Sequence, residues 1–148
     1  MTDLAKFLSV AELLCKRRGV RLTTQRRQVL ELVCSSDRPL GAYDILELIH
    51  VDQPRAAPPT VYRALDFLLQ QGLVHKLETL HAYIGCSHPD HPHASQFLIC
   101  TACGDVTELE DASIADSVDE AAKASGFSPD QGVIEVAGQC ADCKAQEV

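Results

Sequence analysis

The stretch Pro58–Gly72, PPTVYRALDFLLQQG, decides the fold of the first half of this 148-residue chain. Its two prolines suit the first turn of a helix, and its last glycine suits the position just after a helix end. Between them Val61, Leu65 and Leu68 recur at positions i, i+4 and i+7, so they share one face of the helix. We expect this face to be buried and the helix to run from Pro58 to Gln71.

The segments on either side of this helix predict further helices and a hairpin. Apolar residues at helical spacing predict three earlier helices, and a hairpin of two short strands is expected after Gly72. Thr23 or Thr24 supplies an N-cap for the second helix. Helices followed by such a hairpin are typical of a winged helix-turn-helix, with the helix from Pro58 reading the DNA. The expected ranges are about 3–18, 24–34 and 42–50 for the earlier helices and 73–78 and 81–85 for the strands.

The other face of the Pro58 helix carries Tyr62, Arg63 and Asp66. An arginine near the start of a recognition helix can donate two hydrogen bonds to guanine, and a tyrosine ring can pack against a thymine methyl group. The same residues also suit an ordinary solvated helix face, so both interpretations stay open at this point. Basic residues on the first two helices suit either phosphate contacts or solubility: Arg17, Arg18, Arg21, Arg26 and Arg27.

Two CxxC pairs mark the second half of the chain, Cys100 with Cys103 and Cys140 with Cys143. Four thiolates complete a tetrahedral zinc shell and leave no position for water or substrate, so the ion would be structural. The pairs are 36 residues apart, against ~15–20 in a usual zinc ribbon, so a helix and strands must fit between them. Redox motifs or disulfides are the alternative, although seven is an odd number of cysteines and a reducing cytoplasm disfavours disulfides.

Charge and composition divide the chain into two parts. Residues 1–83 hold 11 Lys/Arg and 9 Asp/Glu, whereas residues 84–148 hold 2 and 12, so only the first part suits a phosphate backbone. The segment 86–94, CSHPDHPHA, is expected to be a linker. We therefore expect an α+β protein with a winged helix-turn-helix domain at 1–85 and a small α/β domain at 95–148. The α/β domain should contain strands at about 95–100, 105–109 and 131–137 and a helix at about 112–124.

Several functional classes lack their sequence signals here. No apolar run approaches the ~20 residues of a membrane helix, and no signal peptide is visible, so we expect a cytoplasmic protein without membrane contact. A zinc nucleobase deaminase needs an H-x-E element and a P-C-x-x-C element, and the sequence has neither. We therefore expect no enzyme activity and no small-molecule substrate. A zinc-ribbon interaction module that does not bind DNA is the remaining alternative from a different class.

A second group of metal-binding residue types surrounds the expected linker. One thiolate, two imidazoles and a carboxylate would suit four-coordinate zinc, and the thiolate disfavours iron or manganese. Each residue also has an ordinary explanation, such as a surface histidine or a small buried cysteine. The residues by themselves leave this second site open. The group consists of His75, His81, Cys86, His88, His91, His93 and Glu108.

Three long strings resemble the ferric-uptake-regulator superfamily of metal-sensing bacterial repressors: LTTQRRQVLELV, PPTVYRALDFLLQQGLVHK and FLICTACGDVTE. The resemblance extends from about Leu13 to Cys143. The strings GAYDILEL and HKLETLHAYIGC are most similar to the zinc-uptake-regulator branch. The resemblance implies an N-terminal winged helix, a C-terminal α/β dimerisation domain, and a homodimer that binds operator DNA and represses zinc-acquisition genes when zinc is bound.

The same resemblance implies two zinc ions per chain and a set of DNA contacts. A structural ion falls on the four cysteines of the CxxC pairs. The ligands of the regulatory ion and the DNA contacts are assigned by matching single positions of this chain to the family pattern. The regulatory zinc falls on His75, Cys86, His93 and Glu108, and the DNA contacts on Tyr43, Thr60, Tyr62, Arg63, Arg26 and Arg27.

The chain departs from the superfamily pattern at two places. Ala94–Phe97 replaces a histidine-rich run that many members carry before the first CxxC, and Thr24 stands where proline is frequent. The missing run argues against the third metal site of iron and peroxide sensors and leaves His88 and His91 unassigned. An iron, manganese or peroxide sensor of the same superfamily is the alternative function.

Overall fold

The structure is a computed structural model that describes residues 4–86, 89–90, 95–129 and 132–146. The chain forms two compact units, unit 1 (Met1–Pro92) and unit 2 (His93–Val148). The linker expected at 86–94 lies mostly outside the described residues, and the domain limits around it stay predictions.

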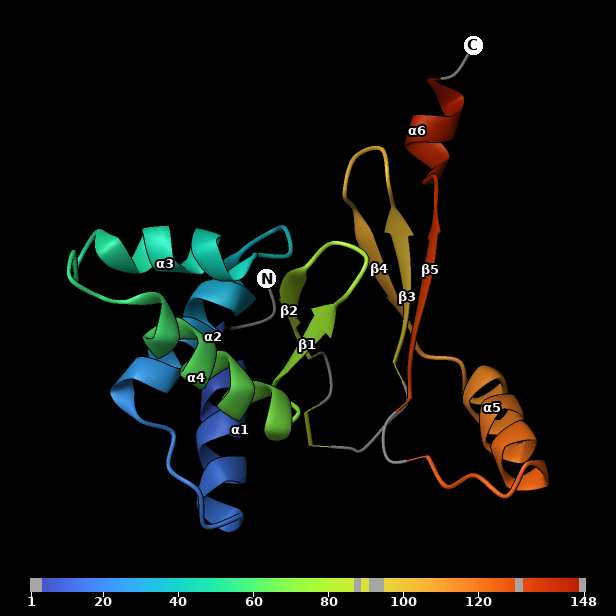
Figure 1. The fold of residues 1–148 in the computed structure, drawn as a ribbon, viewed down its shortest axis with the longest axis horizontal. Coiled ribbons are helices and arrows are strands. Elements are labelled where there is room, and N and C mark those ends of the chain that lie inside the picture. The colour runs from blue at the N-terminus through green and yellow to red at the C-terminus, as the bar shows by residue number, and fades with distance from the viewer. Residues whose placement is uncertain (1–3, 87–88, 91–94, 130–131, 147–148) are drawn as a thin grey trace. The chain divides into compact units, whose positions relative to one another are not determined.

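Unit 1 has the expected order of four helices and a hairpin (Figure 1). The Thr23 hydroxyl caps the second helix by accepting from the Arg26 backbone N–H at 3.3 Å. Gly72 follows the fourth helix with a φ of +68°, a left-handed conformation that a side chain would disfavour. The elements are α1 (Leu4–Arg17), α2 (Thr24–Ser35), α3 (Ala42–His50), α4 (Pro58–Gln70), β1 (Val74–Leu77) and β2 (Ala82–Gly85).

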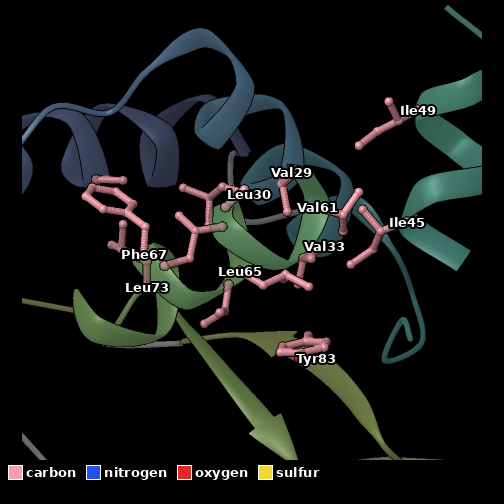
Figure 2. Packing of buried hydrophobic residues seen from close by; sticks show 14 of the residues in the cluster. Val29, Leu30, Val33, Ile45, Ile49, Val61, Leu65, Phe67, Leu73 and Tyr83 are labelled. Atoms are coloured by element: carbon pink, nitrogen blue, oxygen red, sulfur yellow. The ribbon is translucent and has the colours of Figure 1, made fainter. Parts of the chain in front are cut away.

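The apolar face of α4 forms the centre of the core of unit 1 (Figure 2). Val61, Leu65 and Leu68 are at most 1% exposed, which confirms the predicted buried face. They belong to a cluster that also includes residues from α1, α2, α3 and the hairpin. Among its other members are Leu8, Ala11, Val29, Leu30, Val33, Ile45, Ile49 and Tyr83.

The hairpin gains a short third partner that the sequence pattern does not predict. Strands β1 and β2 pair antiparallel, with His75 opposite Ile84. Leu40 then bridges to Tyr83 through two backbone hydrogen bonds of 2.7 and 3.0 Å. A single paired residue shows no alternation of apolar and polar side chains. From the sequence, the segment around Pro39 is therefore expected only as a break between helices.

Unit 2 is a three-stranded sheet with two helices. The strand order is β4-β3-β5, in which β3 pairs antiparallel with β4 and parallel with β5. The last helix is not among the expected elements, because five residues are too few to show a helical period. The elements are β3 (Ser95–Cys100), β4 (Val106–Leu109), α5 (Ala112–Ala124), β5 (Val133–Gly138) and α6 (Ala141–Ala145).

None of the helices in the described part of the chain combines the length and the apolar composition that crossing a bilayer requires.

Replacing Leu65 by alanine should destabilise unit 1 by about 2–5 kcal/mol, because a fully buried side chain would leave a cavity. Its neighbour Asp66 is exposed, so Asp66→Ala is a matched control with an expected effect within about 0.5 kcal/mol. Amide hydrogen exchange of α2 and α4 measures the change. Equal protection in both variants would contradict the central place of Leu65 in the core.

Candidate metal centre and nucleic-acid interface

The four cysteines of the two CxxC pairs come together in unit 2. Their sulfur atoms all lie within 4.8 Å of one another, and Cys103 Sγ is 3.8 Å from Cys140 Sγ. Zinc–sulfur bonds of about 2.3 Å place the corners of a tetrahedron about 3.8 Å apart, whereas a disulfide bond is only about 2.05 Å long. The donor set and its spacing therefore fit a four-thiolate zinc ion.

Parallel pairing of β3 with β5 explains how distant residues meet. The carboxyl ends of parallel strands lie at the same edge of a sheet, and Cys100 at the end of β3 is the partner of Gly138 at the end of β5. Thr101 ties the two ends together, because its backbone N–H and its hydroxyl both donate to the Gly138 carbonyl, at 2.9 and 3.2 Å. The 36 residues between the pairs accommodate β4, α5 and β5.

Each CxxC pair folds into a tight turn around its first sulfur. The Cys103 backbone N–H donates to Cys100 Sγ, and the Cys143 backbone N–H donates to Cys140 Sγ, both at 3.5 Å. Gly104 closes the first turn with a φ of +78° and a hydrogen bond of 2.8 Å to the Cys100 carbonyl. Cys140 caps α6, so the second turn is the first turn of that helix.

The four thiols differ in how readily they ionise. Hydrogen bonding from the backbone of Cys140 and of Cys103 stabilises the Cys100 thiolate and lowers its pKa to about 6. At the other extreme, the neighbouring thiols of Cys140, Cys103 and Cys100 raise the pKa of Cys143 to about 12. A divalent cation would offset the repulsion among four thiolates, so its binding must release protons and weaken as the pH falls.

The residues of the second predicted site lie on separate elements. His75 is in β1, Cys86 directly follows β2, and Glu108 is in β4 opposite Phe97. The Cys86 side chain is buried, and its backbone N–H donates to the Leu73 carbonyl at 3.0 Å. His93 lies outside the described residues, as do His88 and His91.

Cys34 is a further thiol at this place, and the sequence analysis assigned it no role. It lies near the end of α2, which packs against β2. Burial, together with the nearby Cys86 thiol, raises the pKa of Cys34 to about 12, so it is a neutral thiol at ordinary pH. The sequence indicates only that Cys34 faces the core, because it lies four residues after Leu30 on the inner face of α2.

The predicted base-reading residues have accessible side chains. Tyr62 is 43% exposed and Arg63 is also exposed, on the face of α4 opposite its buried face. Thr60 is partly exposed in the first turn of the same helix. Tyr43 is 67% exposed at the start of α3, which packs against α4. Aromatic, hydroxyl and guanidinium groups on such a surface can contact base edges and phosphates.

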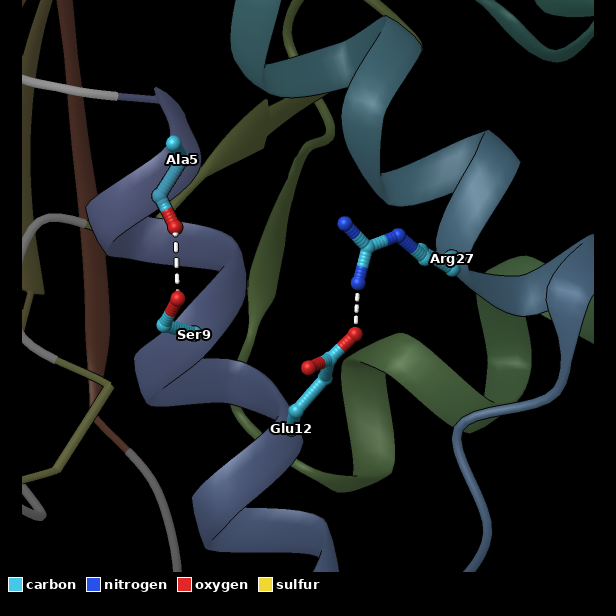
Figure 3. Close-up of polar contacts among 4 residues, drawn as sticks. All are labelled: Ala5, Ser9, Glu12 and Arg27. Carbon is cyan, nitrogen blue, oxygen red and sulfur yellow. Dashed lines mark hydrogen bonds and ion pairs between the residues drawn. The ribbon is translucent and has the colours of Figure 1, made fainter.

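Arg26 and Arg27, the predicted phosphate contacts, already have partners inside unit 1. The Arg26 guanidinium stacks 3.8 Å from the centroid of the Phe67 ring and donates to the Arg21 carbonyl at 2.6 Å. Arg27 forms an ion pair with Glu12 of α1 (Figure 3). Both groups therefore also hold α2 against its neighbours.

One face of the sheet in unit 2 carries exposed apolar side chains. Leu98 and Val136, which are partners on adjacent strands, are 41% and 52% exposed. Helix α5 contributes no buried residue, and Val118 on that helix is 42% exposed. Large apolar side chains gathered on a small unit are typical of a surface that a partner covers.

Comparisons with known proteins give consistent matches over most of the chain. The ferric uptake regulator family matches residues 17–137. The zinc uptake regulation protein of Escherichia coli strain K12 is 45% identical over 143 residues, which cover 96% of this chain and 84% of that protein.

Two solved structures have similar sequences and the same fold. A zinc uptake regulator complexed with zinc and DNA is 44% identical, with a TM-score of 0.91 over 99% of both chains. The crystal structure of holo XcZur is 43% identical, with a TM-score of 0.84 over 95% of this chain and 98% of that one. The chain therefore belongs to the ferric uptake regulator family, in its zinc uptake regulator branch.

Proposed function

We propose that this protein is a zinc-responsive transcriptional repressor in the cytoplasm. It binds operator DNA as a homodimer when a regulatory zinc ion is bound, and it represses zinc-uptake genes. The observation that carries the proposal is the similarity, over 99% of both chains, to a zinc uptake regulator complexed with zinc and DNA. The accessible face of α4 and the cluster of four thiols supply the matching chemistry. The protein is a regulator and has no catalytic role or small-molecule substrate.

Cys100, Cys103, Cys140 and Cys143 hold one structural zinc ion in this proposal. The ion would neutralise the crowded thiolates and join the ends of β3 and β5. Few large side chains of unit 2 are fully buried among the described residues, Phe97 and Ile99 being the main ones, so the ion contributes to folding. A closed four-sulfur shell does not exchange ligands with substrate.

His75, Cys86, His93 and Glu108 hold the regulatory zinc ion, as the family pattern implies. Two imidazoles, one thiolate and one carboxylate form a four-coordinate set, and the thiolate favours zinc over iron or manganese. The ligands come from both compact units, so a single ion bound by all four would restrict the motion of one unit against the other. Zinc binding and DNA binding then favour each other, typically by about 1–3 kcal/mol.

Homodimerisation rests on the exposed apolar side chains of the unit 2 sheet, among them Leu98 and Val136. A dimer presents two copies of α4, and two recognition helices about 34–36 Å apart match successive major grooves. The acidic unit 2 would keep away from the phosphates, so the DNA contacts fall on α2, α3 and α4 of unit 1.

The direct test of the function is a gel-shift titration of operator DNA at buffered metal concentrations. Zinc should promote binding at a lower free concentration than iron or manganese. Promotion by iron or manganese alone would favour the alternative, another metal sensor of the same family. DNA binding that no metal changes would contradict the proposal.

Cys103→Ser should lose the tightly held zinc ion and unfold unit 2, because structural zinc of this kind contributes about 10–16 kcal/mol in zinc-finger peptides. Elemental analysis after mild chelation and hydrogen exchange of β3 and β5 measure both effects. Cys15→Ser replaces a buried thiol of unit 1 and should keep the ion. An intact β3–β5 pairing in the Cys103 variant would contradict the structural role.

Arg63→Ala should weaken specific operator binding by about 1–3 kcal/mol and relax the preference at one base pair of each half-site. Arg27→Ala is the comparison, because a phosphate contact should weaken specific and nonspecific DNA alike and reduce the salt dependence. Binding isotherms at several salt concentrations separate the two. An equal loss on both kinds of DNA in the Arg63 variant would make that residue a phosphate contact.

Cys86→Ser should give a folded dimer whose DNA affinity no longer rises with zinc, since it removes the only thiolate of the proposed regulatory set. Circular dichroism and sedimentation check the fold and the dimer, and a zinc-titrated gel-shift measures activation. Normal zinc activation in this variant would remove Cys86 from the ligand set.

A further inference from the structure

Cys34 and Gly85 make a contact in unit 1 that leaves no room for a side chain at residue 85. A Cβ atom added to Gly85 would lie 2.8 Å from Cys34 Sγ and 3.8 Å from both Cys34 Cα and Cβ. A carbon–sulfur separation of 2.8 Å is shorter than non-bonded atoms tolerate, since even carbon atoms prefer about 3.5–4.0 Å. The thiol of α2 therefore occupies the space that a side chain of β2 would need.

The backbone of Gly85 gives no other reason for a glycine. Its φ does not fall in the left-handed region, unlike that of Gly72 or Gly104. It is the last residue of β2 and pairs with Val74 of β1, where an alanine would normally be accepted. Glycine inside a strand often marks a close approach of another group, and here that group is the Cys34 thiol.

The contact bears directly on Cys86, the next residue. The backbone on either side of this point is fixed, because Gly85 pairs with Val74 and Cys86 donates to the Leu73 carbonyl at 3.0 Å. Cys34 has limited freedom to turn away, since side chains in a helix rarely adopt the third χ1 rotamer. A bulkier residue at 85 therefore either forces the Cys34 thiol into the other χ1 rotamer that the helix allows or displaces the end of β2, and with it Cys86.

We propose that the Cys34–Gly85 contact positions Cys86 for the regulatory zinc ion and so sets the zinc concentration to which the protein responds. The inference rests on the proposed function, because it assigns Cys86 as a zinc ligand. Cys34 acts here through packing, as a positioning residue, and is not a ligand itself. Displacing a residue that orients a metal ligand typically lowers metal affinity by about 10–100-fold.

The test is a double-mutant cycle of Gly85→Ala and Cys34→Ala in the full-length dimer. Gly85→Ala should raise the free zinc concentration for half-maximal DNA binding about tenfold or more. The double variant Cys34→Ala/Gly85→Ala removes the overlap, so the two substitutions should not be additive. Its free zinc concentration for half-maximal DNA binding should return to within about threefold of the wild-type value. Ile84→Val changes the neighbouring strand residue without adding bulk and serves as the control.

Cobalt absorption and urea unfolding give readouts beyond DNA binding. Cobalt added to protein that keeps its four-cysteine zinc should show a weaker thiolate band in Gly85→Ala than in the wild type, and the double variant should recover it. The urea midpoint of the double variant should be at least that of Cys34→Ala, since alanine restricts the unfolded chain more than glycine.

Four outcomes would overturn the inference. An unchanged zinc response in Gly85→Ala, or no recovery in the double variant, removes the positioning role while the proposed function stands. Loss of the cobalt–thiolate band in Cys34→Ala that the double variant does not recover would make Cys34 a ligand. A wild-type protein whose DNA binding ignores zinc would overturn the proposed function, and this inference with it.

Discussion

The inward-facing apolar stripe of α4 is the constraint on which unit 1 depends. Val61, Leu65 and Leu68 are almost fully buried among residues of the other helices and the hairpin. Because a helix repeats every 3.6 residues, burying this stripe turns Tyr62 and Arg63 outward. The core of the unit and its candidate DNA-reading surface are thus two faces of one helix, and neither can rotate without the other.

Unit 2 depends on a different interaction, the parallel pairing of β3 and β5. This pairing brings Cys100 beside the end of β5, two residues before Cys140. The sheet carries exposed apolar side chains on one face, and α5 adds no buried residue, so the unit has little core of its own within the described residues. A metal ion at one end of the sheet and a second copy against its face are the two stabilising contributions that our proposal supplies.

Two arginines of α2 contact neighbouring helices in addition to being partly accessible to solvent. Arg26 covers the Phe67 ring and Arg27 pairs with Glu12, so both join α2 to neighbouring helices. Half-exposed ion pairs of this kind contribute little to stability, about 0–1 kcal/mol. Arg63 is exposed on the outer face of α4, which makes it the sharper probe of sequence-specific DNA binding.

Local features of the sequence determined most of the elements and one of the two candidate metal sites. Helical periodicity predicted α1 to α5 to within a few residues, and the glycine at 72 predicted the end of α4. The spacing of Cys100, Cys103, Cys140 and Cys143 predicted a four-sulfur cluster, and the structure brings these atoms within 4.8 Å of one another. Such signals are readable because each rests on a short local pattern, and two CxxC pairs together supply the four thiolates of one zinc ion.

Only the tertiary structure decided which distant residues touch. The bridge between Leu40 and Tyr83, the stacking of Arg26 on Phe67 and the contact of Cys34 with Gly85 all join segments more than ten residues apart. No periodicity or motif encodes these pairs, because each arises when independently formed elements pack and a small residue happens to face a larger one. The same reason kept Cys34 unassigned in the sequence, where it is one apolar residue on a helix, until packing set it beside the residue preceding Cys86.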